Sequence, residues 1–333
     1  MKSTPAVDPE SVKGYPDGVK VVTYQSSGDQ SEQPALFWKP ESDKPVPLLV
    51  GLHTWSSHYK QDGGEAVYAK WCQKVGWAFI HPNFRGPNRT PEAMGADLAV
   101  ADIVSAVDFA KANAKIDADR IYAIGVSGGG HASLLMAGRA PEIWAGVSAW
   151  CGISDIAAWH AECDGNEKFS RYAKDIENAL GGRPESGTDR AKSATRRSPV
   201  TWLSAAKNVP LDINHGVHDG RTGSVPFTHS LHAWNAVVDE SNQVADSVIA
   251  KFYKTQSPPE PANPDSFYGE KRQPVFRKTA GNTRLTIFEG GHEIIHEPAL
   301  NWLAAQRKGR PAVWEVEKFA DLETGEAEKE SGK

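Results

Sequence analysis

The sequence has few cysteines, no long apolar run and no excess of positive charge, and each absence excludes a class of protein. Three Cys in 333 residues are too few for a disulfide-dense scaffold or a cysteine-rich zinc module. With 37 Lys+Arg against 42 Asp+Glu the formal net charge is −5, whereas nucleic-acid-binding domains carry a basic stripe. No apolar run reaches the roughly 20 residues of a membrane span. We therefore expect no nucleic-acid partner and no membrane span.

The sequence also lacks an apolar leader and a phosphate-binding glycine loop. Residues 1–18 are polar and contain prolines, so they do not form a signal peptide. Because a leader removed on secretion leaves no trace, the compartment stays open between the cytoplasm and the exterior. The glycines at 128–130 lack the Lys and the acidic partner of a nucleotide site, and we expect no cofactor. The sequence predicts no particular oligomeric state.

What the sequence does contain is a series of short β-branched or aromatic runs that alternate with helical patterns. The predicted strands are 20–24, 35–39, 46–53, 76–81, 120–126, 144–150, 210–215 and 284–289, and the predicted helices are 65–75, 95–114, 128–140, 225–240 and 299–308. Several strands, such as 47–52, are apolar on consecutive residues, which is typical of a parallel sheet covered on both faces. The pattern predicts a doubly wound α/β fold.

The same pattern predicts a single α/β domain over residues 1–320. The polar stretch 154–207 follows the sixth strand and is expected to form a lid or a helical excursion over the sheet edge. The stretch 241–282 is long for one connection, so we expect a surface insertion there. The tail 321–333 is almost wholly polar or charged, and we expect it to be disordered.

One motif in the sequence is typical of a nucleophilic serine. Gly125-Val126-Ser127-Gly128-Gly129 follows an apolar strand and opens a helix, which is the context of a G-x-S-x-G nucleophile elbow. Small flanking residues allow the sharp turn that exposes the Ser127 hydroxyl. A glycine-rich strand–helix turn packed for purely steric reasons is the alternative interpretation.

A serine nucleophile needs a base and a carboxylate that orients it. Asp219 follows one predicted strand in a tight turn, and His292 follows the last predicted strand after Gly290-Gly291. Taken singly, Asp219 reads as a turn former and His292 as a residue beside a helix N-terminus. Together with Ser127 they stand in the order Ser, acid, His at the carboxyl ends of strands, where doubly wound sheets place their sites.

These motifs resemble the prolyl oligopeptidase-like branch of the α/β-hydrolases. The resemblance rests on the stretches 121–135, 215–219 with the following Val225-Pro226, 291–292, 82–86, 180–185 and 197–199. It covers roughly residues 45 to 308. The resemblance implies an α/β-hydrolase fold with Ser127 as nucleophile, His292 as general base and Asp219 as the group that orients it.

The resemblance also indicates where the oxyanion hole lies. One donor is expected to be the backbone N–H of Gly128, and the family takes the other from the loop after the third core strand, here residues 53–59. This loop contains His53, but Thr54 and Trp55 replace the glycines of related hydrolases. The second donor therefore stays open between the Trp55 N–H and a side chain such as that of His53.

A rival motif overlaps the predicted general base. His292-Glu293-Ile294-Ile295-His296 spells H-E-x-x-H, the signature of a zinc metalloprotease, and Glu315 and Glu317 lie at a plausible distance for a third ligand. The zinc hypothesis requires one helix to carry both histidines, although two glycines precede His292 directly. It also leaves Ser127 and Asp219 unexplained, so we expect no metal ligands here.

The triad does not choose between esters and peptides. Oligopeptidases carry a large propeller, and the stretch before the first core strand is too short for one, which favours a small-molecule ester over a short peptide as substrate. Trp55, Trp150 and Trp159 fall near the predicted site, and their flat faces would suit a carbohydrate-linked ester. We predict Trp55, Trp159 and Tyr59 as substrate-binding residues.

Overall fold

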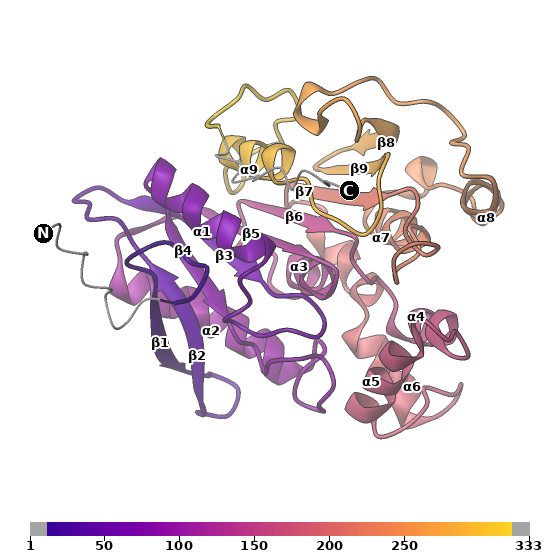
Figure 1. The fold of residues 1–333 in the computed structure, drawn as a ribbon, viewed down its shortest axis with the longest axis horizontal. Coiled ribbons are helices and arrows are strands. Elements are labelled where there is room, and N and C mark those ends of the chain that lie inside the picture. The colour runs from indigo at the N-terminus through magenta and orange to yellow at the C-terminus, as the bar shows by residue number, and fades with distance from the viewer. Residues whose placement is uncertain (1–11, 322–333) are drawn as a thin grey trace, which may run out of the picture.

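The computed structural model of the chain describes residues 12–321 and is built on one mixed sheet (Figure 1). Its strands are β1 (Lys20–Gln25), β2 (Glu32–Trp38), β3 (Val46–Leu52), β4 (Ala78–Pro82), β5 (Ile116–Val126), β6 (Gly146–Trp150), β7 (Leu211–Gly216), β8 (Pro274–Ala280) and β9 (Thr283–Phe288). Their order in the sheet is β1-β2-β4-β3-β5-β6-β7-β9-β8. The strands β4, β3, β5, β6, β7 and β9 run parallel, whereas β1, β2 and β8 join antiparallel at the two sides.

Helices cover both faces of this sheet, as the consecutive apolar residues of the strands predict. They are α1 (Gly64–Val75), α2 (Asp97–Asn113), α3 (Gly128–Arg139), α4 (Ile156–Cys163), α5 (Ser170–Leu180), α6 (Asp189–Arg197), α7 (Thr228–Val237), α8 (Asp246–Thr255) and α9 (His296–Ala305). Alternate residues of the strands face opposite layers: Leu48 and Val50 pack with α2, α3, α7 and α8, whereas Leu49 packs with α1 and α9. The predicted α/β-hydrolase-like fold, a mostly parallel sheet between helices, is confirmed.

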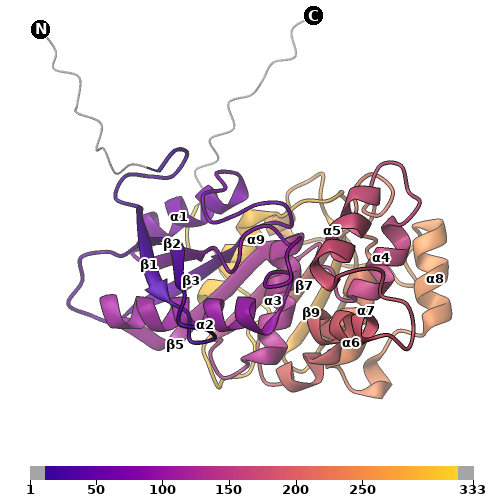
Figure 2. The ribbon, with the colours of Figure 1, turned by 90° about the horizontal axis from the view of Figure 1, so that it is seen from below.

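A third apolar cluster lies outside these two layers, in the segment between β6 and β7. Helices α4, α5 and α6 group together at one end of the molecule (Figures 1 and 2). Asp155 and Thr188 begin α4 and α6 by accepting hydrogen bonds from backbone N–H groups, as N-caps do. The helices enclose their own small core, to which Trp159 and Ile176 contribute. The predicted polar stretch 154–207 is therefore helical in the structure.

The sequence-based description of residues 241–282 as a surface insertion is incomplete. This stretch contains α8, whose Phe252 packs in the main core, and β8, which forms one edge of the sheet. The strand escaped prediction because an edge strand is only half buried and Arg277 and Lys278 interrupt its apolar pattern. The predicted disordered tail lies outside the described residues, apart from Asp321.

The structure also describes the three cysteines and the lengths of the helices. Cys72, Cys151 and Cys163 are all buried and unpaired, so no disulfide joins Cys151 and Cys163. Among the helices of residues 12–321, none combines the length and the hydropathy needed to cross a bilayer.

Candidate active site

Ser127 occupies the sharp turn between β5 and α3. Its backbone has φ 60° and ψ −119°, a conformation that costs a non-glycine residue about 1–3 kcal/mol. The Ser127 N–H donates to the carbonyl of Trp150 at the end of β6 (2.9 Å), and its carbonyl accepts from the N–H of His131 (2.9 Å). The strand, turn and helix that the G-x-S-x-G motif predicts are therefore present, and the strained turn places the serine at the carboxyl edge of the sheet.

The loop after β3 lies directly against this turn. A Cβ atom at Gly128 would stand 2.3 Å from the backbone nitrogen of Trp55, so only glycine fits at that position. The backbone nitrogen of Trp55 therefore lies close to Gly128, the residue after Ser127. An oxyanion hole requires two neighbouring backbone N–H donors, and those of Gly128 and Trp55 stay the predicted pair.

The side chain of His53 does not take part in this arrangement. Both ring nitrogens lie 2.9 Å from backbone carbonyl oxygens, those of Thr54 and Asn83, and the ring stacks on Phe84 with 3.9 Å between centroids. The ring is fully buried, and burial lowers the pKa of His53 to about 4. The prediction of His53 as an oxyanion donor conflicts with this geometry, because its nitrogens are already engaged away from Ser127.

Asp219 lies in the turn after β7 and is completely buried. Its Oδ2 accepts hydrogen bonds from His292 Nδ1 (2.5 Å) and His215 Nε2 (2.9 Å), and its Oδ1 accepts from the backbone N–H groups of Gly220 (2.9 Å) and Val225 (3.2 Å). Burial acts to raise the pKa of Asp219, but the hydrogen bonds from His215 and His292 outweigh it and hold that pKa well below its usual range. The carboxylate is therefore ionised at neutral pH, with four donors around it.

His292 lies in the non-helical loop between β9 and α9, and 23% of its side chain is exposed. Because its Nδ1–H donates to the Asp219 carboxylate, its Nε2 is left as the acceptor of the neutral ring. Gly223 packs against both residues: a Cβ there would stand 2.2 Å from Asp219 Oδ1 and 2.5 Å from His292 Cβ. The Asp219–His292 pair is thus enclosed by backbone that leaves no room for a larger residue.

The topology brings Ser127 and the Asp219–His292 pair to the same edge of the sheet. Ser127 follows β5, Asp219 follows β7 and His292 follows β9, and β5, β6, β7 and β9 are parallel neighbours. Cys151, which follows β6, connects the two sides: its Sγ lies 3.4 Å from the carbonyl of Glu293, and the preceding Trp150 accepts the Ser127 N–H. The carboxyl ends of adjacent parallel strands are where such folds place their reaction centres.

The indoles predicted to bind substrate are buried. Trp55 is 2% exposed and Trp159 is fully buried, and their rings meet edge to face with 4.7 Å between centroids. Trp55 Nε1 donates to Asp175 (3.3 Å), and Trp150 is also fully buried. This packing argues against a stacking platform, because Trp55 and Trp159 cover each other and the ring of Trp150 lies against Tyr268 and Phe288. Tyr59 is partly exposed and stays a predicted substrate contact.

The structure contradicts the helix that the zinc hypothesis requires. Helix α9 begins at His296, so His292 lies before it and the two histidines do not share a helix face. His292 binds Asp219, whereas His296 lies partly buried beside Tyr68 and Gly64. Among residues 12–321, the one group of three His, Cys, Asp or Glu side chains with ligand atoms within 4.8 Å of one another contains neither histidine of the motif; its members are Cys151, His215 and Asp219.

His215 is a further member of this group of side chains, and it was not among the site residues predicted from the sequence. It is fully buried on β7, four residues before Asp219, and it contacts the same carboxylate oxygen as His292. The stretch 215–219 does contain a histidine four residues before the aspartate. This spacing alone does not predict a contact between them, because the contact depends on the turn that brings Asp219 back beside β7 in the folded chain.

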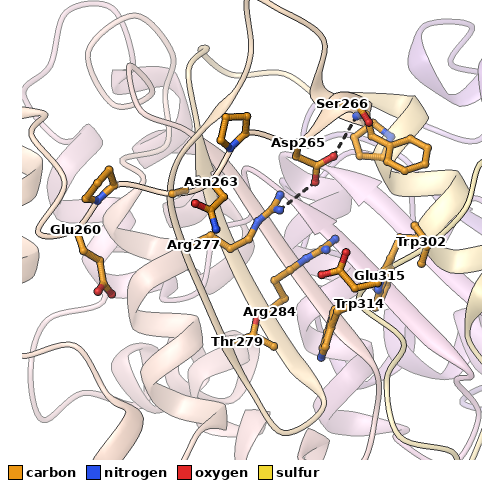
Figure 3. A pocket seen from close by; sticks show the side chains of 16 residues that line it. Glu260, Asn263, Asp265, Ser266, Arg277, Thr279, Arg284, Trp302, Trp314 and Glu315 are labelled. Atoms are coloured by element: carbon orange, nitrogen blue, oxygen red, sulfur yellow. Dashed lines mark hydrogen bonds and ion pairs between the residues drawn. The ribbon is translucent and has the colours of Figure 1, made fainter.

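A cavity of about 640 Å³ lies elsewhere, along the segment 260–267, β8, the start of β9 and α9 (Figure 3). Its arginines are paired: Arg277 with Asp265 (2.9 Å) and Arg284 with the buried Asp212 (2.8 Å). Arg284 stands near the beginning of β9, whereas His292 follows its end. None of the predicted site residues lines this cavity, and we assign it no part in the reaction.

The family model of the prolyl oligopeptidase family matches residues 69–251. This range includes the Ser127 turn and Asp219 and covers more than half of the chain. The chain therefore belongs to the prolyl oligopeptidase family.

The individual proteins to which the chain is similar have low sequence identity to it. The chain is similar to dipeptidyl aminopeptidase BIII from Pseudoxanthomonas mexicana, with 27% identity over 210 residues; the match covers 59% of this chain and 29% of that protein. Among solved structures it is similar to Pyrococcus horikoshii acylaminoacyl peptidase, with TM-score 0.53, 17% identity and coverage of 68% of this chain and 36% of that one. A thermostable esterase gives TM-score 0.51, 16% identity and coverage of 88% and 64%. These structures share the fold, and the chain spans about a third of the length of the peptidases.

Proposed function

We propose that this chain hydrolyses carboxylic esters through an acyl-enzyme formed on Ser127, with His292 as general base and Asp219 as the group that orients it. The observation that carries the proposal is the His292 Nδ1–Asp219 Oδ2 hydrogen bond of 2.5 Å at the sheet edge where the strained Ser127 turn also lies. This bond fixes the tautomer in which His292 Nε2 can accept a proton. The arrangement is what nucleophilic acyl transfer requires.

In the proposed mechanism, Ser127 Oγ attacks the acyl carbon while its proton passes to His292 Nε2. The buried Asp219 carboxylate stabilises the imidazolium that forms. The backbone N–H groups of Gly128 and Trp55 donate to the oxyanion, and the loss of one such donor costs about 3–4 kcal/mol of transition-state stabilisation in comparable enzymes. The alcohol leaves with the proton from His292, and water then attacks the acyl-enzyme with His292 again as base.

We further propose that the helical segment between β6 and β7 acts as a cap that bounds the acyl site. Four hydrogen bonds join it to the loops after β3 and β7. They are Trp55 Nε1 to Asp175 (3.3 Å), Arg171 Nη2 to Ser56 Oγ (3.1 Å), Lys168 Nζ to the carbonyl of Thr222 (2.6 Å) and Trp159 Nε1 to the carbonyl of Ser224 (2.8 Å). These loops carry the proposed oxyanion donor and the proposed acid, so the cap stands over both.

A peptide is the second candidate substrate, and it is supported by the family and by the aminopeptidase relative. Both candidates use the same acyl chemistry. We place the ester first because an alkoxide leaves with less protonation than an amine and the fold matches an esterase over 88% of the chain. A carbohydrate-linked ester loses its main support, since Trp55, Trp150 and Trp159 are buried.

Active-site labelling by a fluorophosphonate tests the proposal. Wild type should label, and Ser127→Ala should lose labelling and at least a thousandfold of its activity on p-nitrophenyl acetate, since removal of a nucleophilic serine abolishes acyl transfer. Ser133→Ala is the matched control, because Ser133 lies on α3 and its buried hydroxyl has no hydrogen-bond partner. An active Ser127→Ala variant would overturn the proposal. Parallel panels of p-nitrophenyl esters and dipeptidyl p-nitroanilides then separate esterase from peptidase.

A further inference from the structure

His215 forms a second imidazole contact with the proposed catalytic carboxylate. Its Nε2 lies 2.9 Å from Asp219 Oδ2 and 3.0 Å from the carbonyl oxygen of Val225, and its Nδ1 lies 2.7 Å from Ser230 Oγ on α7. The ring is fully buried on β7, so water does not compete for these bonds. The three contacts use both nitrogens of the ring.

These contacts determine the tautomer of His215. The Val225 carbonyl and the ionised Asp219 carboxylate only accept hydrogen bonds, so Nε2 must carry the proton. Burial lowers the pKa of His215, and the neutral ring then has its lone pair at Nδ1. Ser230 must therefore donate its hydroxyl proton to Nδ1, and the chain of donors runs from Ser230 through His215 to Asp219.

We infer that His215 is a positioning residue for the proposed triad: it holds Asp219 Oδ2 toward His292 and disperses the charge of that carboxylate, and Ser230 supports it by donating to Nδ1. The inference rests on the proposed function. Asp219 Oδ1 is held by the backbone N–H groups of Gly220 and Val225, whereas Oδ2 has His215 as its partner besides His292. Without His215, Asp219 Oδ2, which accepts the hydrogen bond from His292, would lose the second hydrogen bond that restrains it.

The titratable groups that face His215 are Asp219, His292 and Cys151. Burial raises the pKa of the Cys151 thiol, so it adds no charge at neutral pH. Among these three groups, the Asp219 carboxylate is the one that carries a charge in the resting site. When His215 is removed, this carboxylate loses one hydrogen-bond donor, and its negative charge then acts more strongly on the imidazolium that forms on His292.

The test compares His215→Leu with the matched polar variant His215→Gln, whose amide can still donate to Asp219. For His215→Leu we expect kcat on p-nitrophenyl acetate to fall about ten- to hundredfold, because small misplacements of catalytic groups cost that much. KM should stay within about threefold, and the acid limb of the pH–rate profile should move upward by about half a pH unit. His215→Gln should keep the acid limb of wild type and recover most of kcat.

Ser230→Ala tests the link between Ser230 and His215 separately. Imidazole ¹H–¹⁵N correlation spectra of wild type should show His215 protonated at Nε2, and Ser230→Ala should keep that tautomer with a smaller loss of kcat than His215→Leu, because only the hydrogen bond to Nδ1 is removed. This variant keeps both histidines, so it remains informative even when His215→Leu fails to fold.

Three results would overturn the inference: a wild-type pH profile and kcat in folded His215→Leu, equal losses in the Leu and Gln variants, or an Nδ1–H tautomer in wild type. Failure of the proposed function would look different. In that case Ser127→Ala would retain activity, whereas an inactive Ser127→Ala with an unaffected His215→Leu would overturn this inference alone.

Discussion

Two carboxylates, Asp219 and Glu65, are both fully buried, and they have opposite surroundings. Asp219 accepts four hydrogen bonds, two from imidazoles and two from backbone N–H groups. Both oxygens of Glu65, in the first turn of α1, have no hydrogen-bond partner among the described residues. The pKa of Asp219 is held well below its usual range, whereas burial, with nearby Asp62 adding to it, raises the pKa of Glu65 to about 7.

Hydrogen-bond donors, and not burial alone, therefore decide whether a buried carboxylate is charged. Burial penalises the ionised form of both groups. At Asp219 the strand-end turns after β7 and β9 supply enough N–H groups to reverse that penalty. At Glu65 the neighbouring groups do not, and the Tyr68 hydroxyl and His296 Nε2 close by are themselves buried without partners. Asp219, at the proposed reaction centre, is therefore ionised at neutral pH, whereas Glu65 is ionised in only part of the molecules.

The largest expected effect comes from removing the charge at Asp219. Asp219→Asn should lower kcat about 10³- to 10⁴-fold, because the amide cannot accept from both imidazoles and His292 loses the tautomer that accepts the serine proton. Steady-state kinetics on p-nitrophenyl acetate measures this. Glu65→Gln is the control, and we expect its kcat to stay within about twofold of wild type. Comparable losses in the two variants would abolish the distinction between the two carboxylates.

The second effect concerns stability at Glu65 and depends on pH. The folded-state pKa is raised from 4.5 to about 7, so the stability that the protonated form contributes is complete below about pH 4.5 and is lost as pH rises through 7. Glu65→Gln carries no charge at any pH. We expect it to be more stable than wild type by about 1–3 kcal/mol at pH 8 and to match wild type near pH 4. Urea denaturation at both pH values measures the difference, and a gain that is equal at pH 4 and pH 8 would contradict it.

The smallest effect compares two buried tyrosines. The Tyr268 hydroxyl donates to Asn214 Oδ1 at 2.5 Å, whereas the Tyr68 hydroxyl beside Glu65 has no partner. Tyr268→Phe should lower the free energy of unfolding by about 1–2 kcal/mol, because it leaves a buried acceptor unsatisfied. Tyr68→Phe should be neutral or slightly stabilising. Equal losses in the two variants would show that Tyr68 has a partner in solution.

Much of the fold could be predicted because interior strands have a strong local signal. The strand β3 and the second half of β5 are apolar on consecutive residues, which is typical of a sheet covered on both faces. The edge strand β8 lacked that signal, since one side has no neighbouring strand and Arg277 and Lys278 lie within it. Helix α9 begins at His296, three residues before the predicted start, because the boundary depends on packing against the sheet.

The candidate site likewise contains residues that could be predicted from the sequence and contacts that could not. The order of Ser127, Asp219 and His292, each just after a strand, was readable because parallel strands bring their carboxyl ends to one edge. The burial of Trp55 and Trp159, the engaged ring of His53 and the contact between His215 and Asp219 were not readable. Each depends on which segments meet after folding.

The class of fold, the resemblance to a hydrolase family and the three residues proposed for acyl transfer could be read from the amino-acid sequence, because turn chemistry and strand hydrophobicity are local properties. Which polar groups share a hydrogen bond depends on the folded chain. Two carboxylates that are equally buried differ in charge because β7 and β9 place two imidazoles and two N–H groups around Asp219, and α1 places none around Glu65. Hydrogen-bond partners come from segments distant in the chain, so their number is a property of the folded protein.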